Sequence, residues 1–314
     1  MQFDYPLLLA LSAVIREGTF EAAARSLRVT QSAVSQRIKL LEEKTGAVLI
    51  VRGRPCVATE YGQFLYRHVE QVQLLEHDLQ KNLSSIRSNG AGAPAVIRIA
   101  VNSDSLASWF PEVVQQAGSR LNLHLDIIPD DQEYTADRLK NGDALAAITA
   151  EATPLHGCRL LPLGNMEYVA VATPRFMAKF FREGVTLDAL KRAPNIVYDR
   201  KDLLPQQWMS NAFGDTPAVF GHYMPSFTGY MACLMNGAGW GLHPVISIER
   251  HLNDGTLVEL QPGTSVIVPL YWQSSTPKSE IMNAFSAIVV EVARKALMGS
   301  FDRDTVRRVQ VNER

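Results

Sequence analysis

The chain has 314 residues, of which 46% are hydrophobic and 20% charged, values that are typical of a globular protein and exclude a disordered one. This length makes a single small module unexpected, so we expect two or three domains. The overall charge of −1 hides an asymmetry, because residues 1–58 carry +3 and the remainder −4. A cationic end suited to a polyanion is therefore joined to a mildly acidic body.

The three cysteines, Cys56, Cys158 and Cys233, lie far apart in the sequence and form no C-x-x-C pair. We therefore expect reduced thiols and no zinc or redox site. The apolar run 7–15 is too short to cross a bilayer and is predicted to be a core helix. These features favour a cytoplasmic protein that does not contact a membrane.

Residues 1–58 predict a winged helix-turn-helix. Three short helices are expected over about 6–17, 21–27 and 31–45, the first entered through a proline and ended by a glycine. The tight turn between the second and third helices is the helix-turn-helix pattern. The β-prone residues 48–57, with a Gly-Arg-Pro turn in their middle, then predict a two-stranded wing.

Residues 59–87 predict a long linker helix, and Thr59 offers its N-cap. Apolar residues recur along it in heptad register, a seam that favours a partner helix and hence a homodimer or homotetramer. The alternative is that this stripe docks on the core of its own chain. The seam consists of Leu65, Val69, Val72, Leu79, Leu83 and Ile86.

Residues 88–94 hold almost nothing that can pack and are predicted to be a hinge.

From residue 95 onward, strands are expected to alternate with helices. A β-α-β-α-β order predicts a mostly parallel sheet with helices on both faces. Residues 301–314 form a charged tail. The expected strands are 96–101, 121–128, 144–149, 168–172, 195–198 and 266–273, and the expected helices are 106–117, 135–141 and 278–297.

The stretch 20–42 carries the chemistry of a DNA-binding helix. Small residues at 22–24 let two helices cross at close range, and short polar side chains stand at the start of the third helix. The N-terminus of a helix attracts phosphate, so this end can lie in the major groove. The candidate readers of bases or backbone are Gln31, Ser32, Ser35 and Gln36, and the candidate phosphate contacts are Arg28, Arg37, Lys39, Arg52 and Arg54.

This stretch closely resembles the signature of LysR-type transcription regulators, and the similarity extends to Thr59 and Gly62. Within that family, segments 100–109, 198–202 and 270–272 resemble the ArgP/LysG group, which controls basic amino-acid export and related genes. The resemblance implies a regulator that binds double-stranded DNA and a small effector, here lysine or arginine. Such a regulator can also contact RNA polymerase.

The resemblance further implies an α+β multidomain chain whose effector domain is similar to periplasmic binding proteins. This α/β domain would span residues 95–300, with the ligand held in the cleft between its two subdomains. Subdomain I would comprise about 95–164 and 266–300, and subdomain II about 165–265.

The residues themselves suggest an effector site at the end of the first strand of this domain. The run Asn102-Ser103-Asp104-Ser105 places hydroxyls and free N–H groups where a carboxylate can bind, although Asp104 is also suited to cap a helix. A basic side chain needs acidic partners, and Asp199 is the first choice. The other acidic candidates, which can equally be helix caps or solvated charges, are Asp131, Glu133 and Asp202, and Thr149 and Ser226 lie at further strand ends.

Other functions lack support in the residues. Neither a Ser/His/Asp arrangement nor a metal-ligand spacing is present, so we expect no enzyme, metal or cofactor. The Gly237-x-Gly239-x-Gly241 run lacks the spacing of a dinucleotide loop and is predicted to be a packing turn. A solute-binding module of a transporter is disfavoured by the missing signal peptide and the cationic helix-turn-helix. A different metabolite effector, or an architectural role with weak sequence preference, stays open.

Overall fold

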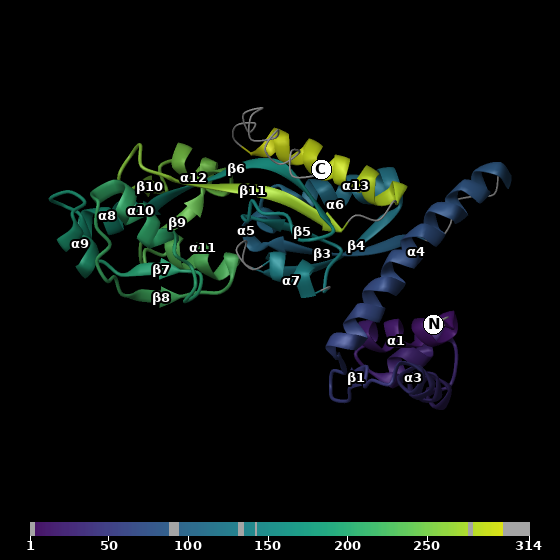
Figure 1. Cartoon of the computed structure of the whole chain (residues 1–314). Coiled ribbons are helices and arrows are strands. Elements are labelled where there is room, and N and C mark those ends of the chain that lie inside the picture. Colours follow the sequence, from purple (N-terminus) through teal and green to yellow (C-terminus); the bar gives the residue numbers. More distant parts are fainter. Residues whose placement is uncertain (1–3, 88–93, 131–134, 142, 276–278, 298–314) are drawn as a thin grey trace.

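The computed structural model describes residues 4–87, 94–130, 135–141, 143–275 and 279–297. A small amino-terminal domain is joined by one long helix, α4 (Glu60–Arg87), to an elongated α/β body, and α4 passes obliquely beside one end of that body (Figure 1). Within the described residues, every helix is too short or too polar to span a bilayer.

The amino-terminal domain is a winged helix-turn-helix, as predicted. Its helices are α1 (Tyr5–Glu17), α2 (Phe20–Leu27) and α3 (Gln31–Thr45). The wing consists of β1 (Ile50–Val51) paired antiparallel with β2 (Val57–Ala58). The apolar stripes of the three helices meet in one core, whose fully buried members include Leu11, Val14, Val34, Leu41 and Leu49.

Side-chain caps fix where α2 and α3 begin. The hydroxyl of Thr19 accepts a hydrogen bond from the Ala22 amide at 3.1 Å, and that of Thr30 accepts one from the Ala33 amide at 3.2 Å. Each cap gives a partner to one of the N–H groups that a helix start leaves unpaired. The turn between the two helices is therefore encoded by local residues.

The wing is fastened to the start of α4 by Thr59 and Gly62. The Thr59 hydroxyl donates to the carbonyl oxygen of Val48 at 2.7 Å and accepts from the Gly62 amide at 3.1 Å. A Cβ atom at Gly62 would lie only 2.0 Å from the carbonyl oxygen of Leu49. The linker helix thus approaches the wing so closely that no side chain fits at this position.

The apolar seam predicted along α4 is divided between two environments. Val69 is fully buried in the core of the amino-terminal domain and Leu65 packs against that core, so this part follows the alternative in which the stripe docks on its own chain. The side chains of 80–87, including Leu83 and Ile86, lie outside the described residues. Leu79 of the seam is instead exposed (58%), as are three apolar residues of α4 outside the seam, Tyr61 (67%), Phe64 (60%) and Leu75 (47%).

The main sheet of the α/β body is mixed, so the prediction of a mostly parallel sheet is wrong. Its strands run in the order β10-β6-β11-β5-β3-β4, with β9 also on β6. Among the described strands of this sheet, β3 (Ala95–Asn102), β4 (Leu123–Asp130) and β5 (Ala146–Thr149) pair in parallel. The long strands β6 (Cys158–Ala172) and β11 (Val266–Ser275) pair antiparallel. These two strands are antiparallel because β6 carries the chain out of subdomain I and β11 carries it back.

Helices flank the sheet in subdomain I. They are α5 (Ser103–Ala107), α6 (Phe110–Leu121), α7 (Thr135–Asn141) and α13 (Glu280–Ala296). The single helix predicted over 106–117 is two helices. Pro111 stands in the first turn of α6, where its missing N–H is harmless, whereas inside a continuous helix it would remove a hydrogen bond.

Subdomain II lies between β6 and β11 in sequence, and the sequence patterns predicted only parts of it. Its centre holds Trp208 and Trp240, both fully buried, with ring centroids 5.5 Å apart. The elements are α8 (Pro174–Phe180), α9 (Leu187–Arg192), β7 (Asn195–Val197), α10 (Leu204–Phe213), β8 (Gly221–Tyr223), α11 (Phe227–Met235), β9 (Gly241–Pro244), α12 (Val245–Asn253) and β10 (Val258–Glu259).

The close approach at Gly62 predicts a specific instability. Gly62→Ala should lower the free energy of unfolding of the amino-terminal domain by about 1–3 kcal/mol, because the new methyl group must displace the backbone of the wing. Chemical denaturation of the full chain followed by circular dichroism measures this change. Gly118→Ala is the control. The Cβ atom added at Gly118 meets no other atom within 4 Å, so this substitution should leave the stability unchanged or increase it. Equal stability of the two variants would contradict the close contact.

Candidate functional site

The first two turns of α3 bring the four predicted readers together. Gln31, Ser32 and Gln36 are exposed and Ser35 is half-exposed, while Val34 on the opposite side is buried. The hydroxyl of Ser32 lies 3.0 Å from that of the cap residue Thr30. Short polar groups thus stand at the amino end of an exposed helix, where base edges and phosphates can be reached.

The basic candidates of the helix-turn-helix stand at different positions on α3 and the turn before it. Lys39 is exposed one turn further along α3 and forms an ion pair with Glu43 at 3.8 Å, while Arg37 is half-exposed and lies off the row of readers. Arg28 is exposed at the turn after α2, with a left-handed φ of 55°. Exposed cations such as Arg28 and Lys39 suit the phosphates that flank a groove.

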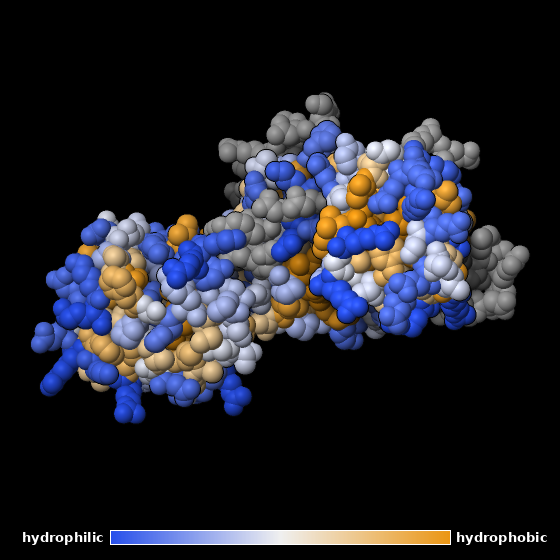
Figure 2. Space-filling view, turned by 90° about the horizontal axis from the view of Figure 1, so that it is seen from below, coloured by the Kyte–Doolittle hydropathy of each residue, from blue (hydrophilic) through white to orange (hydrophobic). Residues whose placement is uncertain are grey.

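Two arginines flank the turn of the wing. The guanidinium of Arg52 lies 5.2 Å from the ring centre of Phe20, the first residue of α2, so a cation–π contact holds it between the wing and the helix-turn-helix. Arg54 is exposed at the turn itself. Figure 2 views the molecule from below, and the amino-terminal domain there shows hydrophilic residues beside hydrophobic ones.

A second site is a cavity between the carboxyl end of β3 and subdomain II. Asn102, Ser103 and Asp104 line it from subdomain I. The Ser103 hydroxyl lies 3.0 Å from the phenol oxygen of Tyr198, which belongs to subdomain II, so a hydrogen bond crosses the cavity. The phenol of Tyr168, on β6, donates to the Asp104 carboxylate at 2.7 Å.

The acidic residues of subdomain II have different positions. Asp202 lines the cavity, and its two carboxylate oxygens accept hydrogen bonds from the amides of Tyr198 at 3.3 Å and Leu204 at 3.0 Å. Asp199, our first choice, is not among the lining residues, and its carboxylate accepts from the amides of Lys201 at 2.7 Å and Asp202 at 3.1 Å. Asp199 thereby shapes the turn that presents Lys201 and Asp202 to the cavity.

Three further effector candidates, Ser105, Thr149 and Ser226, are not among the residues that line the cavity. Ser105 is buried beside it, and its hydroxyl has no hydrogen-bond partner among the described residues. Thr149 is buried in β5, and Ser226 caps α11 by accepting from the Gly229 amide at 3.2 Å. Asp131 and Glu133 lie outside the described residues.

His243 forms a neutral wall of the cavity. Its ring contacts those of Phe227 and Tyr230 edge to face, with centroids 5.1 and 5.3 Å away. Burial, together with the charge of His251, lowers the pKa of His243 to about 4. Its Nδ1 has no partner among the described residues. At neutral pH this imidazole therefore adds no positive charge to the cavity.

Several cavity residues escaped prediction because no motif marks them. Tyr198 ends a predicted strand, so attention to strand ends alone would have found it, and Lys201 follows in the same loop. Tyr168 lies at the start of a predicted strand, and Phe227, Tyr230 and His243 come from elements that the sequence patterns did not resolve. The missed lining residues with polar or aromatic side chains are Tyr168, Tyr198, Lys201, Phe227, Tyr230 and His243.

The glycine run before His243 is a packing turn, as predicted. A Cβ atom at Gly241 would lie 2.1 Å from the phenol oxygen of Tyr230, and one at Gly239 would lie 2.8 Å from the carbonyl oxygen of Pro194. These glycines let β9 approach β7 and the cavity wall. The run thus serves packing inside subdomain II.

A winged helix-turn-helix with an exposed polar helix start, joined to a two-lobed body with a charged cavity, defines a DNA-binding protein that senses a small ligand. Comparison with protein families agrees with this class. Residues 6–63 match the bacterial regulatory helix-turn-helix protein of the lysR family, and residues 90–294 match the LysR substrate binding domain. The chain belongs to the LysR family of transcription regulators, as its signature predicted.

Its relatives include the ArgP and LysG regulators, which confirms the predicted group. It is 42% identical over 270 residues to the HTH-type transcriptional regulator ArgP of Pseudomonas aeruginosa, covering 86% of this chain and 89% of that protein. The crystal structure of ArgP from Mycobacterium tuberculosis is similar, with a TM-score of 0.79, 37% identity, and coverage of 95% and 100% of the two chains. Full-length LysG from Corynebacterium glutamicum with bound effector Arg gives a TM-score of 0.70, 32% identity and the same coverage.

The arrangement of α3 and the wing predicts that substitutions in these elements weaken DNA binding and leave effector binding unchanged. Arg52→Ala should weaken DNA binding and lower the slope of log affinity against log salt by about 1, because one phosphate contact is lost. Ser35→Ala should weaken binding to the preferred site more than to other sequences. Fluorescence anisotropy at several salt concentrations measures both effects. Lys44→Ala, which changes an exposed charge at the far end of α3, is the control, and a parallel loss of effector affinity in Arg52→Ala would contradict this separation.

The buried imidazole predicts a loss of stability in acid. Because the pKa of His243 is lower in the folded chain than in the unfolded one, protons bind the unfolded state preferentially as the pH falls from about 6.5 toward 4. The free energy of unfolding of the wild type should therefore fall by about 3 kcal/mol relative to His243→Gln across this range. Urea denaturation at pH 7 and pH 4 measures the difference, and parallel pH profiles would rule out a buried neutral imidazole.

Proposed function

We propose that this protein is a sequence-specific regulator whose DNA binding responds to a basic amino acid, arginine or lysine, and that it controls genes of amino-acid export or metabolism. The observation that carries the proposal is one cavity with two carboxylates from opposite subdomains. Asp104 comes from subdomain I and Asp202 from subdomain II, and Lys201 lines the same space.

This set of groups is complementary to a basic amino acid. The cationic side chain of arginine or lysine needs charge-assisted hydrogen bonds to carboxylates, which Asp104 and Asp202 supply. The α-carboxylate needs donors, and the ammonium of Lys201 and the hydroxyl of Ser103 are suited to that role. His243 is neutral and does not repel a cation, while the ring of Phe227 can cover the aliphatic part of the ligand.

The relatives support the same ligand class. The LysG structure described above holds arginine as its effector, and that chain is 32% identical to this one. A ligand that touches both subdomains binds the closed cleft better than an open one, and only such a difference in affinity can shift the equilibrium between two states. The bond between Ser103 and Tyr198 lies where such closure would occur.

The rest of the proposal concerns partners and organisation. The exposed apolar residues on α4, such as Phe64 and Leu75, favour a homodimer or homotetramer in which linker helices pair. The domain limits are those predicted from the sequence, with residues 1–58 on DNA and 95–300 holding the effector. A cytoplasmic location and a contact with RNA polymerase fit such a regulator, and the regulatory role needs no catalytic activity.

A thermal-shift screen of the twenty amino acids tests the ligand. Arginine or lysine at 100 times its Kd should stabilise the effector domain by about 2.7 kcal/mol, because it binds only the folded state. Asp202→Asn should weaken that affinity by about tenfold or more, since one charge-assisted hydrogen bond is lost. Asp188→Asn, which changes an exposed carboxylate of subdomain II, is the matched control. Stabilisation by another metabolite, with no effect of arginine or lysine, would overturn this ligand class.

Selection of bound fragments from a library of the organism's own genome tests the DNA partner. We expect enrichment of a few promoter fragments that share a sequence. Salt-dependent binding with no preferred site would instead favour an architectural role.

A further inference from the structure

The linker helix binds the end of another helix through one buried carboxylate. Asp78 on α4 is 9% exposed, and its carboxylate accepts three hydrogen bonds at the start of α13. The donors are the Ser279 hydroxyl at 2.8 Å, the Glu280 amide at 2.9 Å and the Ile281 amide at 3.2 Å. This contact joins residues about two hundred positions apart in the sequence.

The contact is stronger than ordinary packing because of where it falls on α13. The first N–H groups of a helix lack partners within the helix, and the helix dipole makes this end positive. Ser279 already caps the Met282 amide at 3.4 Å, so Asp78 supplies a second, charged cap from another part of the chain. A buried carboxylate is costly without partners, so α4 and the start of α13 need each other.

The strand before α13 runs from the cavity region to this contact. β11 begins at Val266, which pairs with the cavity residue Tyr168, and ends at Ser275, four residues before the N-cap Ser279. Further along α13, the Trp272 indole donates to the Ser286 hydroxyl at 2.9 Å. A change in β11 caused by cleft closure therefore reaches α13 directly.

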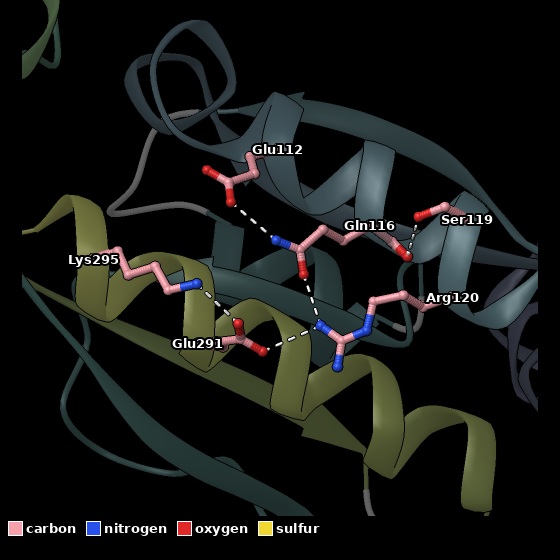
Figure 3. A network of polar contacts seen from close by, with 6 residues as sticks. All are labelled: Glu112, Gln116, Ser119, Arg120, Glu291 and Lys295. Carbon is pink, nitrogen blue, oxygen red and sulfur yellow. Dashed lines mark hydrogen bonds and ion pairs between the residues drawn. The ribbon is translucent and has the colours of Figure 1, made fainter.

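The far end of α13 is tied to subdomain I. Figure 3 shows Arg120 extending from α6 toward Glu291 on α13, where Nη1 and Oε2 lie 3.1 Å apart. Lys295 donates to the same carboxylate at 2.9 Å. This end of α13 is thus linked to α6 by an ion pair, whereas its start is joined to α4 by Asp78.

A second attachment gives the linker helix a defined direction. The guanidinium of Arg98, on β3, lies 5.8 Å from the ring centre of Tyr66 and donates to Asp126 at 2.7 Å. Tyr66 and Asp78 are separated by about 18 Å along the helix axis. Two attachments so far apart determine the angle of α4, and hence the position of the amino-terminal domain, relative to subdomain I.

From these contacts we propose that Asp78 is the positioning residue that couples the effector cavity to the DNA-binding domain. Effector binding changes the strength of the contact between Asp78 and α13, and this change alters the angle of α4. The inference rests on the proposed function, because it requires an effector in the cavity.

The test compares full-length wild type and Asp78→Ala in DNA binding, with and without L-arginine and L-lysine, on the promoter fragment selected above. In the wild type, the effector should change DNA affinity by about 5–150-fold, the usual range of allosteric coupling. In Asp78→Ala this ratio should fall to about twofold or less, while calorimetry still detects binding of the amino acid.

The control separates coupling from stability. Thr186→Ala removes the side-chain cap of α9, whose hydroxyl accepts from the Ala189 amide at 3.2 Å far from α4, and should keep the full ratio. Asp78→Asn keeps the shape and one accepting oxygen but loses the charge, so it should give an intermediate ratio. If Asp78→Ala does not fold, Asp78→Asn is the test variant. A ratio of DNA affinities with and without effector equal to that of the wild type would then overturn the proposal.

Hydrogen exchange gives an independent readout. Arginine should change the protection of the Glu280 and Ile281 amides in the wild type and leave it unchanged in Asp78→Ala. An effector response of Asp78→Ala equal to that of the wild type, or an equal loss in Thr186→Ala, overturns the positioning role alone. A wild type that binds neither arginine nor lysine instead overturns the proposed function together with this inference.

Discussion

The placement of the linker helix α4 is the constraint on which the rest of the structure depends. One side of α4 enters the core of the amino-terminal domain through Val69, and another enters the core of the α/β body through Leu74. Both are buried, so the helix is a shared element of two hydrophobic cores. Because a helix is stiff over this length, the position of α3 is tied to subdomain I by packing as well as by the chain that joins them.

The cavity follows from a similar sharing of elements. β6 and β11 pass between the two subdomains, so each subdomain supplies one wall and neither forms the cavity alone. Two pairs of polar groups at this space are hydrogen-bonded, Ser103 with Tyr198 across the cavity and Asp104 with Tyr168 on β6. An added ligand must therefore compete with existing hydrogen bonds, which favours one that brings its own charges.

The sequence predicted the elements whose signals are local. The proline and glycine that bound α1, together with the short turn between α2 and α3, placed the first helices within a residue or two, and the polar residues at the start of α3 followed from their position. Pairing between distant strands has no such signal. The antiparallel return of β11 along β6 depends on contacts about a hundred residues apart, and the patterns of the early strands favoured a parallel sheet.

The cavity was predicted at the level of segments rather than side chains. The run Asn102 to Asp104 was found because strand ends meet at one edge of a sheet. Asp199 and Asp202 could not be distinguished from the sequence, because both carboxylates accept hydrogen bonds from backbone amides in the same loop, and of the two it is Asp202 that lines the cavity. Aromatic residues such as Tyr168 and His243 carry no mark in the sequence that separates cavity walls from core.

Since subdomain II enters through β6 and leaves through β11, and these strands are paired, both of its ends emerge side by side from the same scaffold. A segment with adjacent ends behaves as an insertion, and insertions of this kind can change length or be exchanged without disturbing the host fold. Ligand preference can thus change in evolution through replacement of subdomain II alone, while the DNA-binding domain is inherited unchanged.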